Sequence, residues 1–201
     1  MSDERFNVLI VCHANLCRSP MAERMARKAL DDRLGADAAG FDLVSAGTHA
    51  WMNQAMHPLA AEVLREYGAD DSGFRSRRLT GGLVERADLV LTATRRQRSE
   101  CVAFDPAAVR RSFTISQFGR YAAALKPYSL TAIWPPQRRL RVMIDEVSVI
   151  RGDLPVVPAE EEDLADPVQS PIEVFRRCAA EIQAVVDVMI GLIAPIQTAP
   201  R

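Results

Sequence analysis

Residues 8–11 form an unbroken run of apolar side chains that leads directly into Cys12, and Arg18 follows with five residues between them. An apolar run of this length, without alternation, is typical of a parallel strand buried on both faces. Ser19 and Pro20 favour the start of a helix, where a missing backbone N–H costs nothing. The sequence therefore predicts a buried strand, a short loop and a helix, an arrangement that places a ligand-binding loop at the carboxyl end of a strand.

The composition of the loop from Cys12 to Arg18 suits an anion. Backbone N–H groups of a short loop before a helix and the fork of an arginine can surround the oxygens of a phosphate-shaped ion. The same positive groups favour the thiolate form of Cys12, and Ser19 is placed to give that thiolate a hydrogen bond. Asn15 suits a loop position with positive φ, which asparagine adopts more readily than most residues.

The loop sequence, Cys12 to Pro20, resembles that of the low-molecular-weight protein tyrosine phosphatases, which reads Cys-x-Gly-Asn-x-Cys-Arg-Ser-Pro. Every fixed position matches except position 14, where this chain has alanine in place of glycine. The methyl group of Ala14 introduces no strain if φ is negative there. The resemblance extends to residues 45–48 and 87–92 and to the pair Asp166-Pro167 near the end of the chain. It covers most of the chain outside residues 126–163.

The resemblance implies a role for each matching residue. Cys12 is expected to be the nucleophile, Arg18 to hold the phosphate oxygens, and Asp166 to protonate the leaving group and then to take a proton from water. The expected substrate-binding residues are His13, Ala14, Asn15, Leu16, Cys17, Ser19 and Trp51. Val168 replaces the aromatic residue that usually follows Asp-Pro in the family. Trp51 is either the opposite wall of the site or an ordinary core or interface tryptophan.

The alternation of strand and helix patterns predicts an α/β fold with three layers, in which a four-stranded, parallel, twisted sheet is flanked by helices on both faces and the phosphate loop follows the first strand. A chain of 201 residues with 48% hydrophobic content is expected to form a single domain over residues 1–201, with an insertion at about 126–163. Strands are predicted at 6–11, 41–45, 88–92 and 112–115. Helices are predicted at 19–34, 57–68, 80–86, 95–103, 116–125 and 171–193.

The insertion has no counterpart in the resemblance. An amphipathic helix is expected over 136–151, between two connectors that contain prolines. The acidic run at 160–163 is interpreted as a solvated loop or as a group of charges that repels anionic substrates. The segment itself is expected either to shape the mouth of the site or to be a surface elaboration.

A formal net charge of −1 argues against nucleic acid and anionic membranes as partners. No signal-peptide or membrane-spanning pattern is found, so a cytoplasmic location is expected. In that compartment Cys17 is a candidate redox partner for Cys12. The three histidines lie in separate segments, so no metal site is expected, and no cofactor is expected either. The arginines at 75, 77 and 78 are either solvated or placed to recruit an acidic phosphoprotein.

The main hypothesis is hydrolysis of phosphomonoesters through a phosphocysteine, with a phosphotyrosine-containing protein or a small aryl phosphate as substrate. One alternative is an arsenate reductase recycled by a small thiol, because arsenate mimics phosphate. A thioredoxin-coupled version would need two further cysteines close together, and only Cys101 lies in the middle of the chain. The other alternative, prompted by Ala14 and Val168, is a noncatalytic module that binds phosphate.

Overall fold

The computed structural model describes residues 5–125 and 135–194. Its centre is one sheet of four parallel strands in the order β2-β1-β3-β4. The strands are β1 (Phe6–Cys12), β2 (Phe41–Gly47), β3 (Leu89–Thr92) and β4 (Ser112–Thr114). The predicted parallel sheet of four strands is confirmed, and the strand bounds agree to within two residues.

Alternate residues of β1 enter two separate cores. Val8 and Ile10 belong to the larger core, whereas Leu9 and Val11 belong to the smaller core on the opposite face. Successive side chains of a strand point to opposite faces, so burial on both faces requires the continuous apolar run seen in the sequence.

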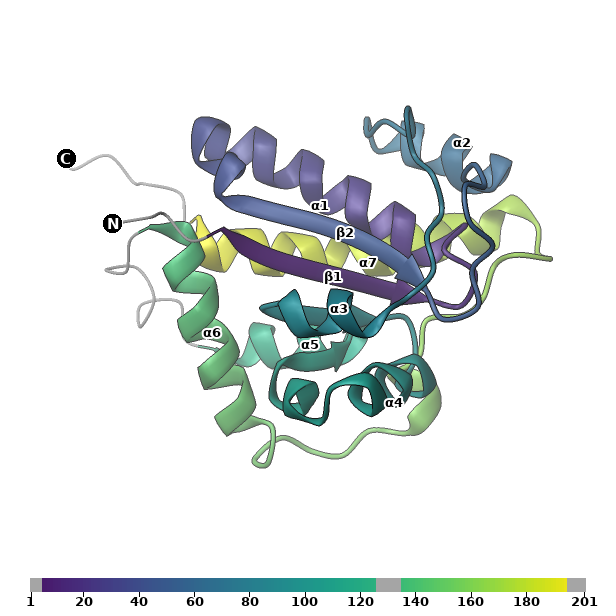
Figure 1. Cartoon of the computed structure of the whole chain (residues 1–201). Coiled ribbons are helices and arrows are strands. Elements are labelled where there is room, and N and C mark those ends of the chain that lie inside the picture. Colours follow the sequence, from purple (N-terminus) through teal and green to yellow (C-terminus); the bar gives the residue numbers. More distant parts are fainter. Residues whose placement is uncertain (1–4, 126–134, 195–201) are drawn as a thin grey trace.

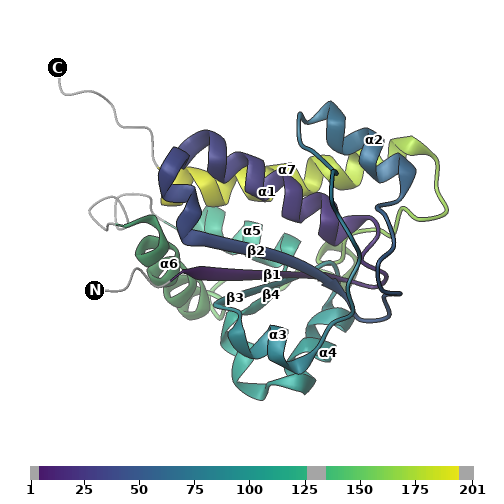
Figure 2. The ribbon, with the colours of Figure 1, turned by 45° about the horizontal axis from the view of Figure 1, so that its top comes forward.

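Helices cover both faces of the sheet, as Figures 1 and 2 show. The larger core lies beneath α1 (Arg18–Leu34), α5 (Ile115–Ala124) and α7 (Ile172–Ile193). The smaller core contains residues of α3 (Gly81–Arg86), α4 (Arg95–Phe104) and the 3-10 helix η2 (Pro106–Arg111). The predicted three-layer α/β architecture is confirmed.

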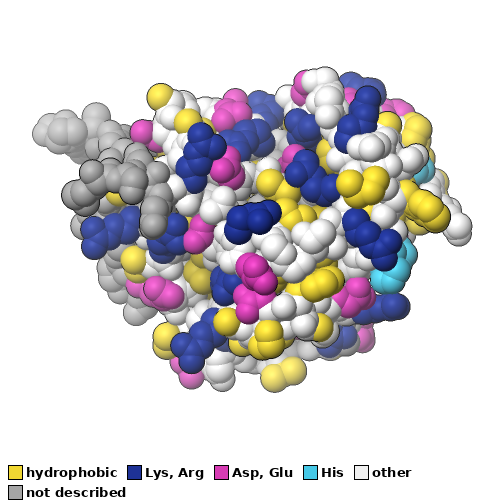
Figure 3. Space-filling view, in the orientation of Figure 1, with side chains coloured by type: hydrophobic (Ala, Val, Ile, Leu, Met, Phe, Trp, Pro, Cys, Tyr) yellow, Lys and Arg dark blue, Asp and Glu magenta, His cyan; other side chains and the backbone are white. Residues whose placement is uncertain are grey.

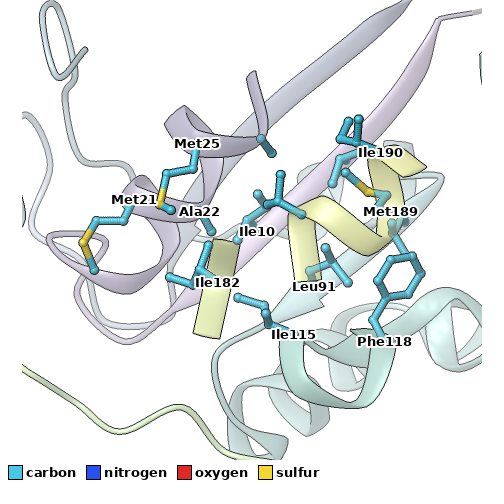
Figure 4. Close-up of a cluster of buried hydrophobic side chains, with 14 of the residues drawn as sticks. Ile10, Met21, Ala22, Met25, Leu91, Ile115, Phe118, Ile182, Met189 and Ile190 are labelled. Atoms are coloured by element: carbon cyan, nitrogen blue, oxygen red, sulfur yellow. The ribbon is translucent and has the colours of Figure 1, made fainter. Parts of the chain in front are cut away.

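Figure 4 shows how the larger core joins three elements around β1. Ile10 of β1 lies between methionines of α1 and the apolar side chains of α7. Ile182, Val186, Met189 and Ile193 of α7 are all at most 6% exposed, which confirms the apolar stripe predicted for this helix. The packing fixes α1, and hence the loop before it, against the sheet.

The remaining helices of the described residues are α2 (Pro58–Glu66), α6 (Pro136–Ile150) and the 3-10 helices η1 (Gly35–Gly40) and η4 (Ala159–Glu161). The helix expected over 136–151 is therefore confirmed as α6, whereas residues 126–134 of the predicted insertion lie outside the described residues. The 3-10 helices were not predicted, because such short segments of small residues lack apolar periodicity. Within residues 5–125 and 135–194, no helix is long and apolar enough to cross a membrane.

Candidate active site

The loop from Cys12 to Arg18 lies at the carboxyl end of β1 and continues directly into α1. β1 lies between β2 and β3, so the chain leaves β1 toward β2 and later returns to β3 on the other side. This reversal of direction opens a crevice at the carboxyl end of the sheet, which is where open α/β sheets bind ligands. The predicted position of the phosphate loop, after the first strand, is confirmed.

The Cys12 side chain is buried and receives polar contacts from its own loop. Its Sγ lies 3.0 Å from Ser19 Oγ, and the backbone N–H of Asn15 donates to the same sulfur over 3.3 Å. The expected contact between Ser19 and the Cys12 sulfur is confirmed. The Asn15 N–H, the Ser19 hydroxyl and the N-terminus of α1 are thus directed at one thiol, an arrangement that favours negative charge there.

Asn15 holds the loop in shape. Its φ of 55° confirms the expected left-handed conformation, and its fully buried amide reaches three partners. Nδ2 donates to Ser19 Oγ over 3.0 Å and to Ser45 Oγ over 2.9 Å, while Oδ1 accepts from the Arg77 backbone N–H over 2.8 Å. One asparagine therefore ties the loop to β2 and to a segment 62 residues away.

Two small residues let the loop close. Ala14 does not adopt a positive φ, so its methyl group, the one departure from the family motif, introduces no backbone strain. At Gly47, by contrast, a Cβ would lie 2.6 Å from the carbonyl oxygen of His13. Gly47 is therefore required for the loop to lie against β2, a role that the sequence analysis did not assign.

Arg18 and Asp166 meet at the mouth of the loop. Arg18 Nη1 donates to the Leu164 carbonyl oxygen over 3.0 Å, and Nη2 lies 2.5 Å from Asp166 Oδ2, across 148 residues of sequence. The Arg18 side chain is 4% exposed and its Nε has no hydrogen-bond partner within the described part of the chain, whereas the Asp166 carboxyl is 44% exposed. A buried guanidinium N–H without a partner is costly, and an anion oxygen would satisfy it.

The segment that carries Asp166 is anchored by the acidic run before it. Glu162 is 8% exposed and accepts hydrogen bonds from Gln117 Nε2, over 2.5 Å, and Arg120 Nη2, over 2.9 Å. Asp163 accepts from the backbone N–H of Arg95 over 2.8 Å, at the first residue of α4. The interpretation of this run as a solvated loop is wrong for these two residues, because both are engaged by the helices that they contact.

The loop and Asp166 line a pocket with a cavity volume of about 50 Å³. Its lining consists of Cys12, His13, Ala14, Leu16, Cys17, Arg18, Asp166 and Val168. Seven of the ten expected site residues therefore line one pocket, whereas Asn15, Ser19 and Trp51 do not line it. Ala14, Leu16 and Val168 give the pocket an apolar wall that suits a ring rather than a charged group.

Trp51 does not line this pocket and is 82% exposed, which excludes the interpretation of Trp51 as a core residue. His13 is exposed at the rim, and its ring stacks on His49 with the centroids 4.6 Å apart. His13 and His49 therefore belong to the surface around the mouth of the pocket.

The other thiols differ from Cys12 in their surroundings. Burial, and to a smaller extent the neighbouring Cys12 and Asp166, raises the pKa of Cys17 to about 12, so this thiol stays protonated at neutral pH. Burial also raises the pKa of Cys101 and of Cys178 to about 12. Among the described residues, no group of three or more His, Cys, Asp or Glu side chains is placed to hold a metal ion.

The fold and the site together define a class of protein: an α/β domain in which a thiol, an arginine and a carboxyl group converge on an anion loop after the first strand. The model of one family matches residues 7–128, and its description is low molecular weight phosphotyrosine protein phosphatase. The chain belongs to this family, as the resemblance in its loop indicated, and is a cysteine-dependent phosphatase.

Individual relatives agree with this assignment. The chain is 36% identical over 114 residues to the probable low molecular weight protein-tyrosine-phosphatase EpsP of Ralstonia solanacearum. These 114 residues are 57% of this chain and 73% of EpsP. The crystal structure of a low molecular weight protein tyrosine phosphatase from T. tengcongensis superposes with a TM-score of 0.65 at 28% identity, covering 92% of this chain and 97% of that one.

A second group of relatives has a different substrate in its name. A protein-arginine-phosphatase of Geobacillus stearothermophilus is 26% identical over 182 residues, which are 90% of this chain and 92% of that protein. The structure of the arginine phosphatase YwlE from the same organism gives a TM-score of 0.61 at 25% identity, with 91% and 89% coverage.

The two alternatives considered from the sequence are not favoured by these relatives, which are phosphatases by name. The structure adds that Cys101 lies in the smaller core, whereas Cys12 lies in the larger core on the other face of the sheet. Cys101 is therefore not a second thiol of this site.

Proposed function

We propose that this protein removes the phosphate from phosphotyrosine in proteins, with Cys12 as nucleophile, Arg18 as phosphate ligand and Asp166 as general acid and base. The observation that carries the proposal is the buried Arg18 guanidinium, which lines the same pocket as Cys12 and forms an ion pair with Asp166, while its Nε has no hydrogen-bond partner among the described residues. A bound phosphate would supply oxygens to this guanidinium and to the backbone N–H groups of the loop.

The reaction takes two steps. The Cys12 thiolate attacks phosphorus, the bond from phosphorus to the tyrosine oxygen breaks, and protonated Asp166 gives its proton to the leaving oxygen. Water then attacks the phosphocysteine, Asp166 takes a proton from that water, and phosphate leaves with the thiolate restored. Ser19, 3.0 Å from the sulfur, stabilises the thiolate as it departs.

The remaining site residues position the substrate. His13, Ala14, Asn15, Leu16 and Cys17 supply the loop backbone, and the side chains of Leu16 and Val168 contact the ring of the tyrosine. An apolar wall disfavours a guanidinium, because burying charge without a partner is costly. Trp51 does not line the pocket, so the contact proposed for it is with the protein around the phosphotyrosine and not with the ring itself.

A single series of assays tests the chemistry. Cys12→Ser is expected to abolish turnover of aryl phosphates, because a serine hydroxyl is a far weaker nucleophile at neutral pH. Asp166→Asn is expected to lower kcat by about 10²-fold to 10⁴-fold for phenyl phosphate and much less for p-nitrophenyl phosphate, whose leaving group needs little protonation. Turnover by Cys12→Ser at the wild-type rate would refute the mechanism.

A second candidate substrate is protein phosphoarginine, because the similarity to the G. stearothermophilus protein-arginine-phosphatase extends over 90% of the chain. The same thiolate would attack phosphorus, and the nitrogen of the guanidine would leave with the proton from Asp166. Two peptides of equal length, one with phosphotyrosine and one with phosphoarginine, distinguish the candidates. A higher kcat/KM for phosphoarginine would overturn the proposed preference.

We also propose that Cys17 protects Cys12 from irreversible oxidation. A peroxide would oxidise the Cys12 thiolate to a sulfenic acid, and the Cys17 thiol would condense with it to a disulfide with loss of water. Cys17→Ala is expected to lose activity to peroxide without recovery on addition of dithiothreitol, whereas the wild type recovers. Equal recovery of both proteins would contradict this role. The cytoplasmic location stays a prediction.

A further inference from the structure

Two loop segments beside the pocket expose an unusual set of side chains. Trp51 is 82% exposed and Met52 57% exposed, in the loop that follows β2. The second segment, residues 75–78, carries three exposed arginines. We call these five side chains the Trp51 surface: Trp51, Met52, Arg75, Arg77 and Arg78.

The two segments are held together by their backbones. Asn53 N–H donates to the Ser76 carbonyl oxygen and Ser76 N–H donates to the Gln54 carbonyl oxygen, both over 2.9 Å. Ser76 Oγ also donates to the Trp51 carbonyl oxygen over 2.5 Å. Because these bonds fix the backbone, the exposed side chains project from a preorganised surface, and binding to it requires little ordering of the loop.

The same segments are joined directly to the phosphate loop. The Arg77 N–H donates to Asn15 Oδ1 over 2.8 Å, and the N–H groups of Thr48 and His49 donate to the carbonyl oxygens of Cys12 and His13 over 3.0 and 2.9 Å. In Figure 3, histidine atoms and Lys or Arg atoms gather at the right-hand edge, the end at which β1 and β2 finish in Figure 1. A protein chain whose phosphate enters the pocket therefore has this surface beside it.

The three arginines carry charge that no carboxylate of the described residues neutralises by an ion pair. Within residues 5–125 and 135–194, none of them forms an ion pair with an acidic side chain. The two carboxylates earlier in the same loop are engaged elsewhere, since Asp71 lies 3.4 Å from Arg65 and Asp70 accepts from the Ser72 hydroxyl. The surface is therefore locally positive on a chain whose formal net charge is −1.

We propose that the Trp51 surface is a docking site for the acidic residues that flank the phosphorylated residue of a substrate protein. The proposal rests on the proposed function and adds the class of substrate sequence. The arginines pair with Asp and Glu side chains of the substrate, and Trp51 and Met52 cover its apolar stems.

The test compares two fluorescein-labelled phosphotyrosine peptides of equal length, one with Asp and Glu on both sides of the phosphotyrosine and one with Asn and Gln instead. Their Kd values are measured by fluorescence anisotropy on Cys12→Ser, which prevents turnover, and kcat/KM is measured on the wild type. Three exposed ion pairs are expected to favour the acidic peptide by about tenfold at low salt, and less at high salt.

The decisive variant carries Arg75→Gln, Arg77→Gln and Arg78→Gln, and its Kd ratio between the two peptides is expected to fall to about 1. Arg86→Gln, an exposed arginine in α3, is the matched control and is expected to keep the ratio. A ratio near 1 in the parent protein, an unchanged ratio in the triple variant, or no binding of either peptide overturns the proposal. Failure of the proposed function is a separate result, since it would remove turnover of both peptides while the Kd ratio remained.

Discussion

Replacement of Asn15 by alanine tests how much of the phosphate loop's shape depends on one side chain. The amide of Asn15 is fully buried and makes three hydrogen bonds of 2.8 to 3.0 Å. Each such bond contributes about 1 kcal/mol net, and alanine at a φ of 55° costs roughly 1 kcal/mol more than asparagine. Asn15→Ala is therefore expected to lower the free energy of unfolding by about 4 kcal/mol, a large part of the usual 5–15 kcal/mol.

The structure offers a matched control in Asn53, which also has a positive φ, of 61°, but is exposed. Among the described residues, Asn53 makes a hydrogen bond only through its backbone. Asn53→Ala is expected to cost about 1 kcal/mol, from the backbone conformation alone. Urea unfolding followed by circular dichroism gives both values. Equal losses in the two variants would refute the view that the Asn15 amide network stabilises the loop.

Two further predictions concern the anchor of Asp166 and the buried thiols. Glu162→Ala removes a buried hydrogen bond to Gln117 and a partly buried one to Arg120, and is expected to lower kcat for phenyl phosphate several-fold more than for p-nitrophenyl phosphate. The exposed Glu160→Ala is the control, and equal effects on both substrates would contradict a role in positioning the acid. Burial raises the pKa values of the Cys17, Cys101 and Cys178 thiols from 9.0 to about 12, so these thiols stay protonated in the folded protein when they ionise in the unfolded chain. The free energy of unfolding is therefore independent of these thiols below pH 9. It falls as pH rises from 9 toward 12, by up to about 1.4 kcal/mol per pH unit for each thiol. Cys101→Ala is expected to reduce that slope by the share of one thiol in denaturant titrations at pH 9 to 11, and an unchanged slope would show that Cys101 ionises equally in both states.

The acidic run at 160–163 shows where sequence interpretation fails. Four successive acidic residues are typical of a solvated loop, yet Glu162 is buried against Gln117 and Arg120, which lie on α5 more than 40 residues earlier. Nothing within the run signals these partners, because a contact of that separation depends on how α5 and α4 pack against the sheet. The same holds for Trp51, whose exposure follows from the path of its loop and not from its residue type.

The sequence by itself determined the strand, the phosphate loop and the start of α1, because each is specified by residues a few positions apart: the apolar run at 8–11, the φ preference of Asn15 and Pro20 in the first helical turn. Local periodicity was also enough for α6 and for the stripe of α7. Only the tertiary structure decided that Asp166 lies 2.5 Å from Arg18, that Gly47 must lack a side chain and that the backbone of Arg77 donates to Asn15 in the phosphate loop. These relations join residues that are far apart in the chain, so they exist only once the order of the strands and the packing of the helices bring the segments together.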